Sequence, residues 1–508
     1  MSQQELELPK GWVKTKLDDV VIRISNGTSE KQTKEKTKFP VTRIETISDT
    51  EINFNRVRYL KNCSKKILDK YKMEYGDILF SNINSDSHLG KTAIFHLTDI
   101  ELIHGMNLLL IRSNREIILP KLLNFIFNYH RTSGFFYSIA QHAVNQSSIN
   151  QTRLKKTPIL LPPLNEQKRI VSKIEELFSK IDSTKQSLEH TKLQLEQYKK
   201  SLLTSAFEGK LTDAKQYDDQ LEIPKLLQLI ESERNDIFLK TILKNNLSGD
   251  RFKQISPREY NPENMPISTK KWHIVSLETI CSFVQAGSTP LRTENSNFSE
   301  TGFPLIKVEN ILKNGEVFLK NNQLRITPKP HNKMWRSKVF PDDILINIVG
   351  PPLGKIGLVP KKFPESNINQ AIVLMRTVPS YLNKFLLFCL QSPKYYDYQL
   401  KLSSGVRQEN IRKSSIGTIP IPLPSLKEQK EIVSQIEQGF SLIENTSQII
   451  ESTLQNLQTM KMSVLKQAFE GKLVPQDPND EPASVLLERI KSTKESQSTK
   501  QRGMKNVK

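Results

Sequence analysis

The sequence has few of the features that mark secreted, membrane or metal-bound proteins. It holds only three cysteines, Cys63, Cys281 and Cys389, and none has CxxC or Cys/His spacing, so neither a disulfide framework nor a zinc site is expected. No uninterrupted apolar run approaches the roughly 20 residues that a transmembrane helix needs. The first residues, MSQQELELPKGW, are polar and acidic, unlike a secretory signal. We therefore expect a soluble cytoplasmic protein with reduced, mostly buried thiols.

Motifs for catalysis are also missing. An adenine methyltransferase needs an Asn/Asp-Pro-Pro-aromatic loop, whereas the Pro-Pro pairs of this chain stand only in LPPL and GPPL. We find no HExxH pair, no Gly-rich dinucleotide fingerprint and no nuclease cluster of carboxylates and lysine. The Gly-Lys pairs at 90–91 and 354–355 lack the leading glycine of a phosphate loop, because Ser85 and Val349 take its place. These absences favour a binding module over an enzyme.

Positive charge is what the chain has in excess. It carries 74 Lys+Arg against 54 Asp+Glu, a formal net charge of +20. Nucleic acid is therefore the first candidate partner, since a basic balance attracts polyanions. A basic protein that is merely soluble stays open on composition alone.

An internal repeat orders the rest of the sequence. The stretch Leu161–Leu211 recurs without a gap at Leu423–Leu473, 262 residues later. A less similar block precedes each copy. The matched residues of the two blocks include Trp12 with Trp272, Gly27 with Gly287 and Asp77 with Asp343. Short alternating apolar runs predict strands bounded by turns: VTRIETI and YGDILFSNI in the first block, and PLIKVENI and PDDILINIV in the second. A repeat of this length predicts a protein of two similar halves.

The repeated stretches predict two long helices that pair as a coiled coil. Apolar or small residues follow alternating steps of four and three over about five heptads. In the first helix these are Ile170, Ile174, Leu177, Ile181, Thr184, Leu188, Thr191, Leu195, Tyr198, Leu202 and Ala206. In the second they are Ile432, Ile436, Gly439, Ile443, Thr446, Ile450, Thr453, Leu457, Met460, Val464 and Ala468.

The linker between the copies is long enough for the chain to reverse, so we expect antiparallel pairing with one block at each end of a rod. The seam threonines could then meet, Thr184 with Thr453 and Thr191 with Thr446, in polar layers that fix the register. Threonines without a specific partner are an equally open interpretation.

The motifs together resemble the specificity subunit of a Type I restriction–modification system. The residues that carry the resemblance are GW…L…NGTS, GDILFSN, LPPLNEQKRIV and AFEGKL, with KW…L…AGSTP, DDILIN, LPSLKEQKEIV and AFEGKL in the second half. It implies an α+β fold: two similar mixed α/β target recognition domains, as pseudo-twofold half-repeats, separated by two long antiparallel coiled-coil helices. The expected boundaries are 1–160 for the first domain, 161–211 for the first helix, 212–265 for a linker with short helices, 266–421 for the second domain, 422–473 for the second helix, and 474–508 for a short helix and a disordered tail.

The resemblance also implies partners and a division of labour. The chain would read a bipartite, asymmetric site on double-stranded DNA, with no cofactor and no catalysis of its own. Two modification subunits that use S-adenosylmethionine would dock on the helices, and whether two motor-nuclease subunits with ATP and Mg²⁺ join them is left open. The expected docking residues are Glu166, Gln167, Lys168, Glu428, Gln429 and Lys430.

Base-reading residues are expected among loop amides and cations, because Arg suits guanine and Asn or Gln suits adenine in the major groove. In the first block the candidates are Asn26, Thr28, Arg43, Asn82, Asn84, Lys91, Asn145, Gln146 and Gln151. In the second they are Ser288, Thr289, Arg292, Lys307, Asn310, Arg325, Lys355, Arg407 and Gln408.

Two hypotheses of other classes stay open at this point. A coiled-coil scaffold that joins two protein partners, with nonspecific nucleic-acid contact, fits the repeat equally well, although the basic, amide-rich loops favour DNA reading. A self-sufficient methyltransferase or nuclease would need a catalytic motif that the sequence lacks.

Overall fold

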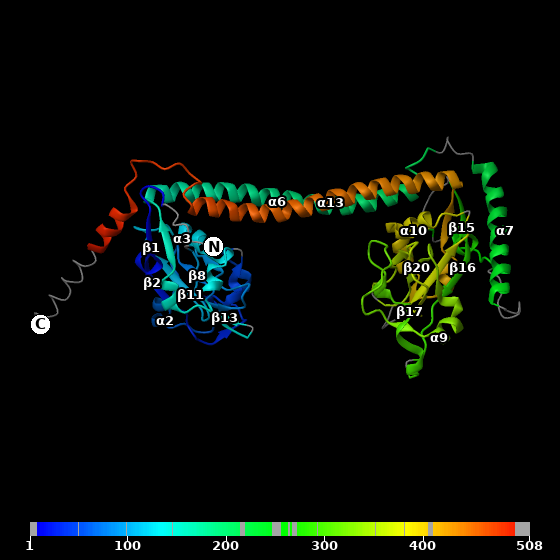
Figure 1. Ribbon diagram of the computed structural model, residues 1–508, viewed down its shortest axis with the longest axis horizontal. Helices are drawn as coiled ribbons and strands as arrows, with labels where there is room; N and C mark the ends of the chain where they lie inside the picture. Colours follow the sequence, from blue (N-terminus) through cyan, green and yellow to red (C-terminus); the bar gives the residue numbers. More distant parts are fainter. Residues whose placement is uncertain are drawn as a thin grey trace, which may run out of the picture. The chain divides into compact units, whose positions relative to one another are not determined.

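The computed structural model forms two compact units, which are described separately (Figure 1). Unit 1 is built from Met1–Glu189 and Glu451–Lys508, and unit 2 from His190–Ile450. The structure describes residues 8–48, 50–97, 99–144, 146–213, 219–245, 256–262, 265–266, 272–291, 293–350, 352–379, 381–404 and 410–492. The expected disordered tail lies almost entirely outside these residues. Unit 1 thus takes its residues from both ends of the chain.

Unit 1 is organised around an antiparallel four-stranded sheet in the order β10-β8-β11-β2. Its strands are β2 (Val21–Asn26), β8 (Ile78–Phe80), β10 (Thr92–Ile94) and β11 (Leu109–Ser113). Successive residues of a strand point to opposite faces. Ile78 and Phe80 accordingly enter the main core beneath helix α3 (Pro120–Thr132), whereas Leu79 enters a smaller core on the other face. Both faces are covered, which explains why β8 is apolar without interruption.

Short elements complete the first block. Two smaller sheets have the orders β3-β7-β4 and β12-β13-β9, and β5 pairs with β6. The strands are β1 (Val13–Lys16), β3 (Gln32–Thr33), β4 (Pro40–Val41), β5 (Ile47–Ser48), β6 (Glu51–Ile52), β7 (Arg58–Leu60), β9 (Ile83–Asn84), β12 (Gln141–Ala143), β13 (Gln146–Ser148) and β14 (Pro158–Leu161). The short helices are α1 (Leu17–Val20), α2 (Lys65–Tyr71), α4 (Phe135–Ser138) and α5 (Gln151–Lys155), with 3-10 turns at Ile44–Thr46 and Phe54–Arg56.

Unit 2 repeats this plan. Its four-stranded sheet has the order β16-β23-β20-β21, and its first and last strands pair as β15-β26, as β1 pairs with β14 in unit 1. The strands are β15 (His273–Ser276), β16 (Cys281–Ala286), β17 (Phe298–Ile306), β18 (Arg325–Ile326), β19 (Lys338–Val339), β20 (Ile344–Asn347), β21 (Ile356–Leu358), β22 (Ser366–Ile368), β23 (Ile372–Thr377), β24 (Ser403–Ser404), β25 (Asn410–Ile411) and β26 (Pro420–Leu423). The helices are α8 (Leu277–Ile280), α9 (Pro328–Lys333), α10 (Asn383–Gln391), α11 (Pro393–Lys401) and α12 (Lys413–Gly417).

Two segments predicted as strands are partly helical. VTRIETI and PLIKVENI each contain a 3-10 turn, at Ile44–Thr46 and Val308–Asn310. In both, the third residue of the turn reaches back: Thr46 Oγ1 accepts from Arg43 N and Asn310 Oδ1 accepts from Lys307 N. Apolar alternation alone could not reveal this local capping.

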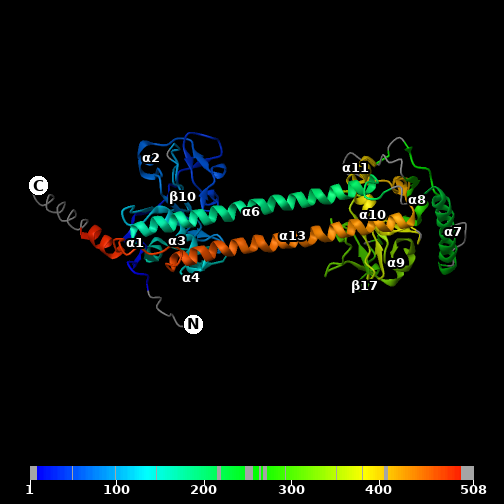
Figure 2. The same cartoon turned by 90° about the horizontal axis from the view of Figure 1, so that it is seen from above.

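The two repeated stretches form the long helices α6 (Leu164–Phe207) and α13 (Leu426–Phe469), each of 44 residues, which lie side by side (Figure 2). Their pairing is antiparallel. In unit 1, Lys461 Nζ lies 2.6 Å from Asp182 and 5.0 Å from the centre of the Phe178 ring. In unit 2, Lys199 Nζ lies 4.6 Å from the centre of the Phe440 ring.

The predicted seam is correct for its buried isoleucines and wrong at the exposed residues Thr184, Tyr198 and Met460. Tyr198 and Met460 are 51% and 52% exposed, and the residues that follow them, Lys199 and Lys461, turn inward instead. An α-helix has 3.6 residues per turn, so a strict 3.5-residue repeat drifts unless the helices supercoil to compensate. The hydroxyl groups of the seam threonines Thr184 and Thr446 donate to Lys180 O and Leu442 O of their own helices. The register that they were expected to fix stays a prediction.

A further helix follows each long helix, and where short helices were expected between 212 and 265 the structure has one helix of 27 residues. In unit 2, α7 (Asp219–Asn245) buries Ile223 and Ile230 in the main core. In unit 1, a helix at 483–492 buries Ala483 and Leu487 in the corresponding core. Both helices therefore help to fix a block to the end of its long helix.

Candidate nucleic-acid interface

In unit 1, several candidate base readers lie at one end of the four-stranded sheet. Asn26 is the last residue of β2 and pairs with Leu109 of β11, which pairs in turn with Phe80 of β8. The chain leaves β8 at this same end and enters Asn82. Lys91 comes to the same place, because its carbonyl oxygen accepts from Ser81 N at 2.8 Å. Three candidates from three separate segments, Asn26, Asn82 and Lys91, therefore share one edge.

A hairpin extends this edge. Strands β12 and β13 pair with each other, and β13 also pairs with β9 so that Ser147 lies opposite Asn84. Gln146 on β13 is exposed, and Val144 in the turn is 92% exposed. Asn145, between them, lies outside the described residues. The hairpin therefore carries Gln146 beside Asn84, whose side chain donates to Ser81 Oγ at 3.0 Å and accepts from Ser85 N at 2.9 Å.

Other candidates of the first block are less free to contact DNA. Thr28 is buried, and its N–H donates to His104 O at 2.9 Å. Arg43 forms an ion pair of 3.1 Å with Glu45. Gln151 is half-buried in the first turn of α5. Thr28 is therefore corrected from a base reader to a loop-positioning residue.

In unit 2, Ser288 and Lys355 occupy the same end of the corresponding sheet. Ser288 N donates to Ile368 O at 3.1 Å, just as Thr28 N donates to His104 O. The backbone at Lys355 is fixed by Asn347, whose Oδ1 accepts from Lys355 N at 2.7 Å. The side chain of Thr289 is hydrogen-bonded to Gln370, an exposed amide that sequence reasoning missed. Gln370 follows a strand, and that was the only signal in the sequence that could have indicated it.

One candidate in unit 2 is wrong and others are engaged or not described. Asn310 is fully buried, and its Nδ2 donates to Phe318 O and Gln323 Oε1, so it holds a loop together and cannot reach a base. Arg325 Nη1 donates to Gly302 O at 3.0 Å, and Lys307 is half-buried at the start of a 3-10 turn. Arg292, Arg407 and Gln408 lie outside the described residues.

The matched glycines explain why these loops have their shape. A Cβ on Gly27 would lie 1.9 Å from Gly105 O, and a Cβ on Gly287 would lie 2.2 Å from Asn369 O. Each contact is with backbone, which cannot move aside, so only glycine fits. The NGTS and AGSTP segments thus bring their polar residues to the sheet edge through close backbone packing.

Matched ion pairs brace both sheets. Arg112 binds Asp77 with two hydrogen bonds of 2.8 Å, and Arg376 binds Asp343 with two of 2.7 Å. Asp77 raises the pKa of Arg112, and burial raises the pKa of Asp343 against the opposing effect of Arg376. Burial also lowers the pKa of His104 to about 4, which keeps this histidine neutral inside unit 1. These groups are structural.

Four of the six expected docking residues are buried, which corrects that prediction. Trp12 Nε1 donates to Glu166 Oε2 and Trp272 Nε1 donates to Glu428 Oε2, both at 3.0 Å. Gln167 Oε1 accepts from Leu119 N at 2.9 Å at the start of α3. Gln429 makes the matching bond to the residue before α10. The Glu-Gln pair of each helix therefore fastens its own block, and only Lys168 and Lys430 stay exposed for a partner.

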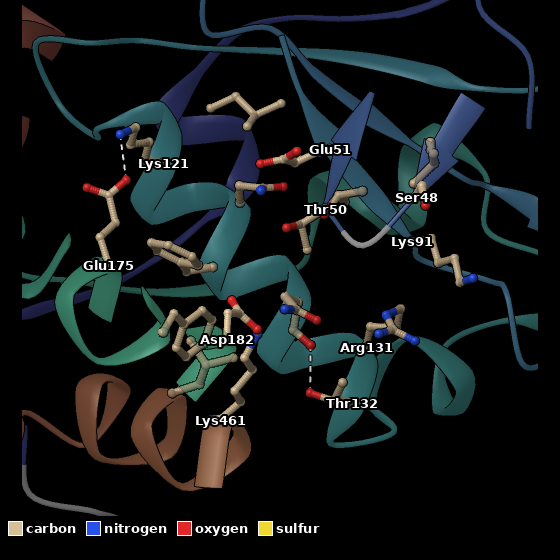
Figure 3. A pocket seen from close by; sticks show the side chains of 18 of the residues that line it. Ser48, Thr50, Glu51, Lys91, Lys121, Arg131, Thr132, Glu175, Asp182 and Lys461 are labelled. Carbon is tan, nitrogen blue, oxygen red and sulfur yellow. Dashed lines mark hydrogen bonds and ion pairs between the residues drawn. The ribbon is translucent and has the colours of Figure 1, made fainter. Parts of the chain in front are cut away.

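A cleft of about 1050 Å³ lies in unit 1 between α3, the β5-β6 hairpin and the paired helices (Figure 3). Its charged side chains include the ion pairs Lys121–Glu175 and Lys461–Asp182, at 2.5 and 2.6 Å. The oxygens Thr92 Oγ1 and Asn124 Oδ1 border it without a hydrogen-bond partner among the described residues. No hydrogen-bonded pair of a nucleophile and a base lies among its described lining residues.

The described residues offer little other chemistry. They contain no cluster of three or more His, Cys, Asp or Glu side chains that could hold a metal ion. Within the same residues, every helix is too short or too polar to cross a membrane. The three cysteines are unpaired, Cys281 and Cys389 being buried, and burial raises the pKa of both.

Comparison with known proteins defines the family. The model of the Type I restriction modification DNA specificity domain matches residues 9–193 and 269–454, one match to each block with part of its helix. The chain belongs to this family.

Two relatives illustrate how far the likeness extends. The putative type I restriction enzyme MjaX specificity subunit of Methanocaldococcus jannaschii is 29% identical over 474 residues, covering 92% of this chain and 95% of the relative. The type I restriction enzyme EcoBI specificity subunit of Escherichia coli is 28% identical over 382 residues, covering 72% of this chain and 71% of the relative.

Solved structures agree on the fold. A chain from a structure of the type I R-M system has a TM-score of 0.62 at 18% identity and covers 92% of this chain and 100% of its own length. The HsdS subunit from Thermoanaerobacter tengcongensis has a TM-score of 0.52 at 17% identity and covers 93% of this chain and 100% of its own length. At these identities the likeness concerns the fold, and it includes both mixed α/β blocks and the long helices.

Proposed function

We propose that this chain is the DNA-specificity subunit of a Type I restriction–modification complex and reads a bipartite site, one half with each block. It contributes recognition, and the chemistry belongs to modification subunits that use S-adenosylmethionine. Motor-nuclease subunits that use ATP and Mg²⁺ are further candidate partners.

One observation carries the proposal: the two blocks share a frame but differ at the sheet edge. The close-packed glycines, the Asp–Arg braces and the Trp–Glu joints are matched in both units. At the sheet edge the blocks differ: Asn26 and Asn82 of unit 1 align with the apolar residues Ala286 and Ile348, whereas Gln146 aligns with an identical residue, Gln408. A common frame with different polar residues suits two different half-sites, because base edges are distinguished by the donors and acceptors that face them.

The paired helices have two roles in this proposal. They set the number of unspecified base pairs between the half-sites, and their exposed faces, with Lys168 and Lys430, receive the modification subunits. The burial of Glu166, Gln167, Glu428 and Gln429 supports a docking surface that excludes these four residues.

The proposal is tested by mapping methylated adenines across the genome in cells with and without this chain. We expect a bipartite, asymmetric motif that disappears with the chain. A chain in which Gln146 is replaced by alanine should relax one half of the motif and leave the other unchanged, because each mismatched or unread base pair is worth about 1–3 kcal/mol.

The controls separate recognition from folding and from the alternative hypotheses. Glu116→Gln changes an exposed residue of unit 1 away from the sheet edge and should leave the motif intact. Methyl transfer by the purified chain alone would overturn the non-enzymatic role. Methylation that keeps its motif in the absence of the chain would overturn the proposed function.

A further inference from the structure

Three side chains join the hairpin of unit 1 to the neighbouring loop. Ser147 of β13 donates its hydroxyl proton to Asp86, which lies in the loop after β9. His142 of β12 approaches the same serine, with Nδ1 2.7 Å from Ser147 Oγ. The other ring nitrogen, Nε2, lies 3.1 Å from Tyr137 O. Asp86 Oδ1 is also 3.5 Å from His142 Nδ1.

The hydrogens of this network can be assigned from chemistry. A backbone carbonyl only accepts, so His142 Nε2 must carry a proton. The single hydroxyl proton of Ser147 is given to Asp86, so Ser147 Oγ can only accept from Nδ1, which must carry a proton too. An imidazole with both nitrogens protonated is a cation. The network is therefore complete when His142 is charged and Asp86 is ionised.

Loss of one proton breaks the network. If His142 Nδ1 loses its proton, it becomes an acceptor, as the Asp86 carboxylate already is. The single hydroxyl proton of Ser147 can then be given to Asp86 or to His142 but not to both, so one of the two contacts has no proton between its atoms. The ring of Tyr137 is a titratable neighbour, with its centroid 4.4 Å from that of the histidine ring. His88 and Arg153, on adjoining segments, bond instead to Ser87 and to Ile139 O. Asp86 supplies the negative charge that stabilises the imidazolium.

We propose that Asp86, His142 and Ser147 form a proton-dependent clamp that positions the β12–β13 hairpin for reading the half-site of the first block. This inference rests on the proposed function. The three are positioning residues: they act through Gln146, which directly precedes Ser147 on β13. Pairing also cancels the negative charge of Asp86, which would otherwise repel phosphate at a DNA-reading edge.

The second block offers an internal control. The residues aligned with Asp86, His142 and Ser147 are Gly350, Ser404 and Glu409, none of which can rebuild the clamp. Any pH dependence that arises from the clamp must therefore appear in one half of the bipartite site only. General effects of pH on DNA affinity would act on both halves.

The test uses the full chain with its modification subunits and duplexes that carry the mapped site or a single mismatch in either half. The half-site of the first block is the one that Gln146→Ala relaxes. We expect discrimination against a mismatch in this half to fall roughly two- to fivefold between about pH 5.5 and about pH 8, because an exposed ion pair supports an effect of about this size. Discrimination in the other half should not change.

Variants complete the test. Asp86→Asn and His142→Gln should each remove the pH dependence, whereas His88→Gln, which changes the histidine of the adjoining loop, should keep it. Equal pH effects on both halves, or a pH dependence that survives in Asp86→Asn and His142→Gln, would overturn the clamp. Failure to find any bipartite site would overturn the proposed function instead, and with it the clamp.

Discussion

At each junction between a block and its long helix, a buried tryptophan N–H is held by a glutamate of the helix. The two junctions differ in one respect: Thr212 donates to the second oxygen of Glu428, whereas Glu166 Oε1 has no partner among the described residues. Burial accordingly raises the pKa of Glu166, and the bond from Trp12 opposes this shift. This carboxyl group thus contributes to the attachment of the first block, together with Gln167 and the shared apolar core.

Replacing Glu166 by alanine should destabilise unit 1. The indole N–H of Trp12 would lose its acceptor while buried, which costs about 1–3 kcal/mol. Chemical denaturation followed by tryptophan fluorescence would measure this loss. Glu166→Gln keeps an acceptor oxygen and serves as the matched variant, so an equal loss in both would contradict the role assigned to this bond.

The same carboxyl group predicts a pH dependence. Because its pKa is raised on folding, the folded chain holds this proton to higher pH than the unfolded chain does, so unit 1 should lose stability as the pH rises above about 4 to 5. Denaturation over a pH series should show this loss in the natural chain and not in Glu166→Gln. An unchanged pH profile in Glu166→Gln would refute the assignment.

For single residues, prediction from the sequence fails where the role of a polar side chain depends on whether it is buried or exposed. Glu166 and Gln167 stand in a polar run at the start of a helix, where spacing cannot tell a residue that faces its own block from one that faces solvent. Asn310 likewise looks like a free loop amide, but it completes the hydrogen bonds of a buried turn. In both cases tertiary contacts between distant segments decide the role.

Among the elements, the long helices are the most predictable from the sequence, because the spacing of their apolar residues repeats over many turns. The isoleucines of the predicted seam are buried, and the error at Tyr198 and Met460 falls at the same position in both copies. In unit 2, the seam leaves no room for a side chain at Gly439, because a Cβ added there would lie 2.5 Å from Leu202 Cδ2. The two helices are thus closely packed at this level.

Replacing Gly439 by leucine should therefore overpack the helix pair, at a cost of about 1–3 kcal/mol. Adding Leu202→Ala should recover part of this loss of stability, because it removes the side chain with which the new leucine would clash. A double-mutant cycle of denaturation free energies would measure the coupling between the two positions. Gln438→Leu, at the neighbouring exposed position, is the control. Strictly additive effects of the two changes would argue against this contact.

For the whole molecule, the proposed function makes helix length a determinant of the recognised site. Removing one heptad from each long helix shortens the pair by about 10 Å at 1.5 Å per residue. At 3.4 Å per base pair this corresponds to about three base pairs.

Adenine mapping with such a chain should give the same two half-sites with a shorter spacer. The matched control removes seven residues from the linker segment 246–255. This deletion should leave the DNA spacer between the half-sites unchanged. A shortened chain that reads different half-sites would contradict the spacer role of the helices.

The composition of unit 1 from both ends of the chain has a consequence for the order of synthesis. His190–Ile450 is complete before the last part of unit 1 is made, and Leu465, Ala468, Phe469 and Leu487 then enter the core that was begun by the first block. Chains fold as they emerge, with domains folding as units. The first block to be translated is thus the last to be finished, and a chain that ends at Ile450 would contain all of the second half and only part of the first.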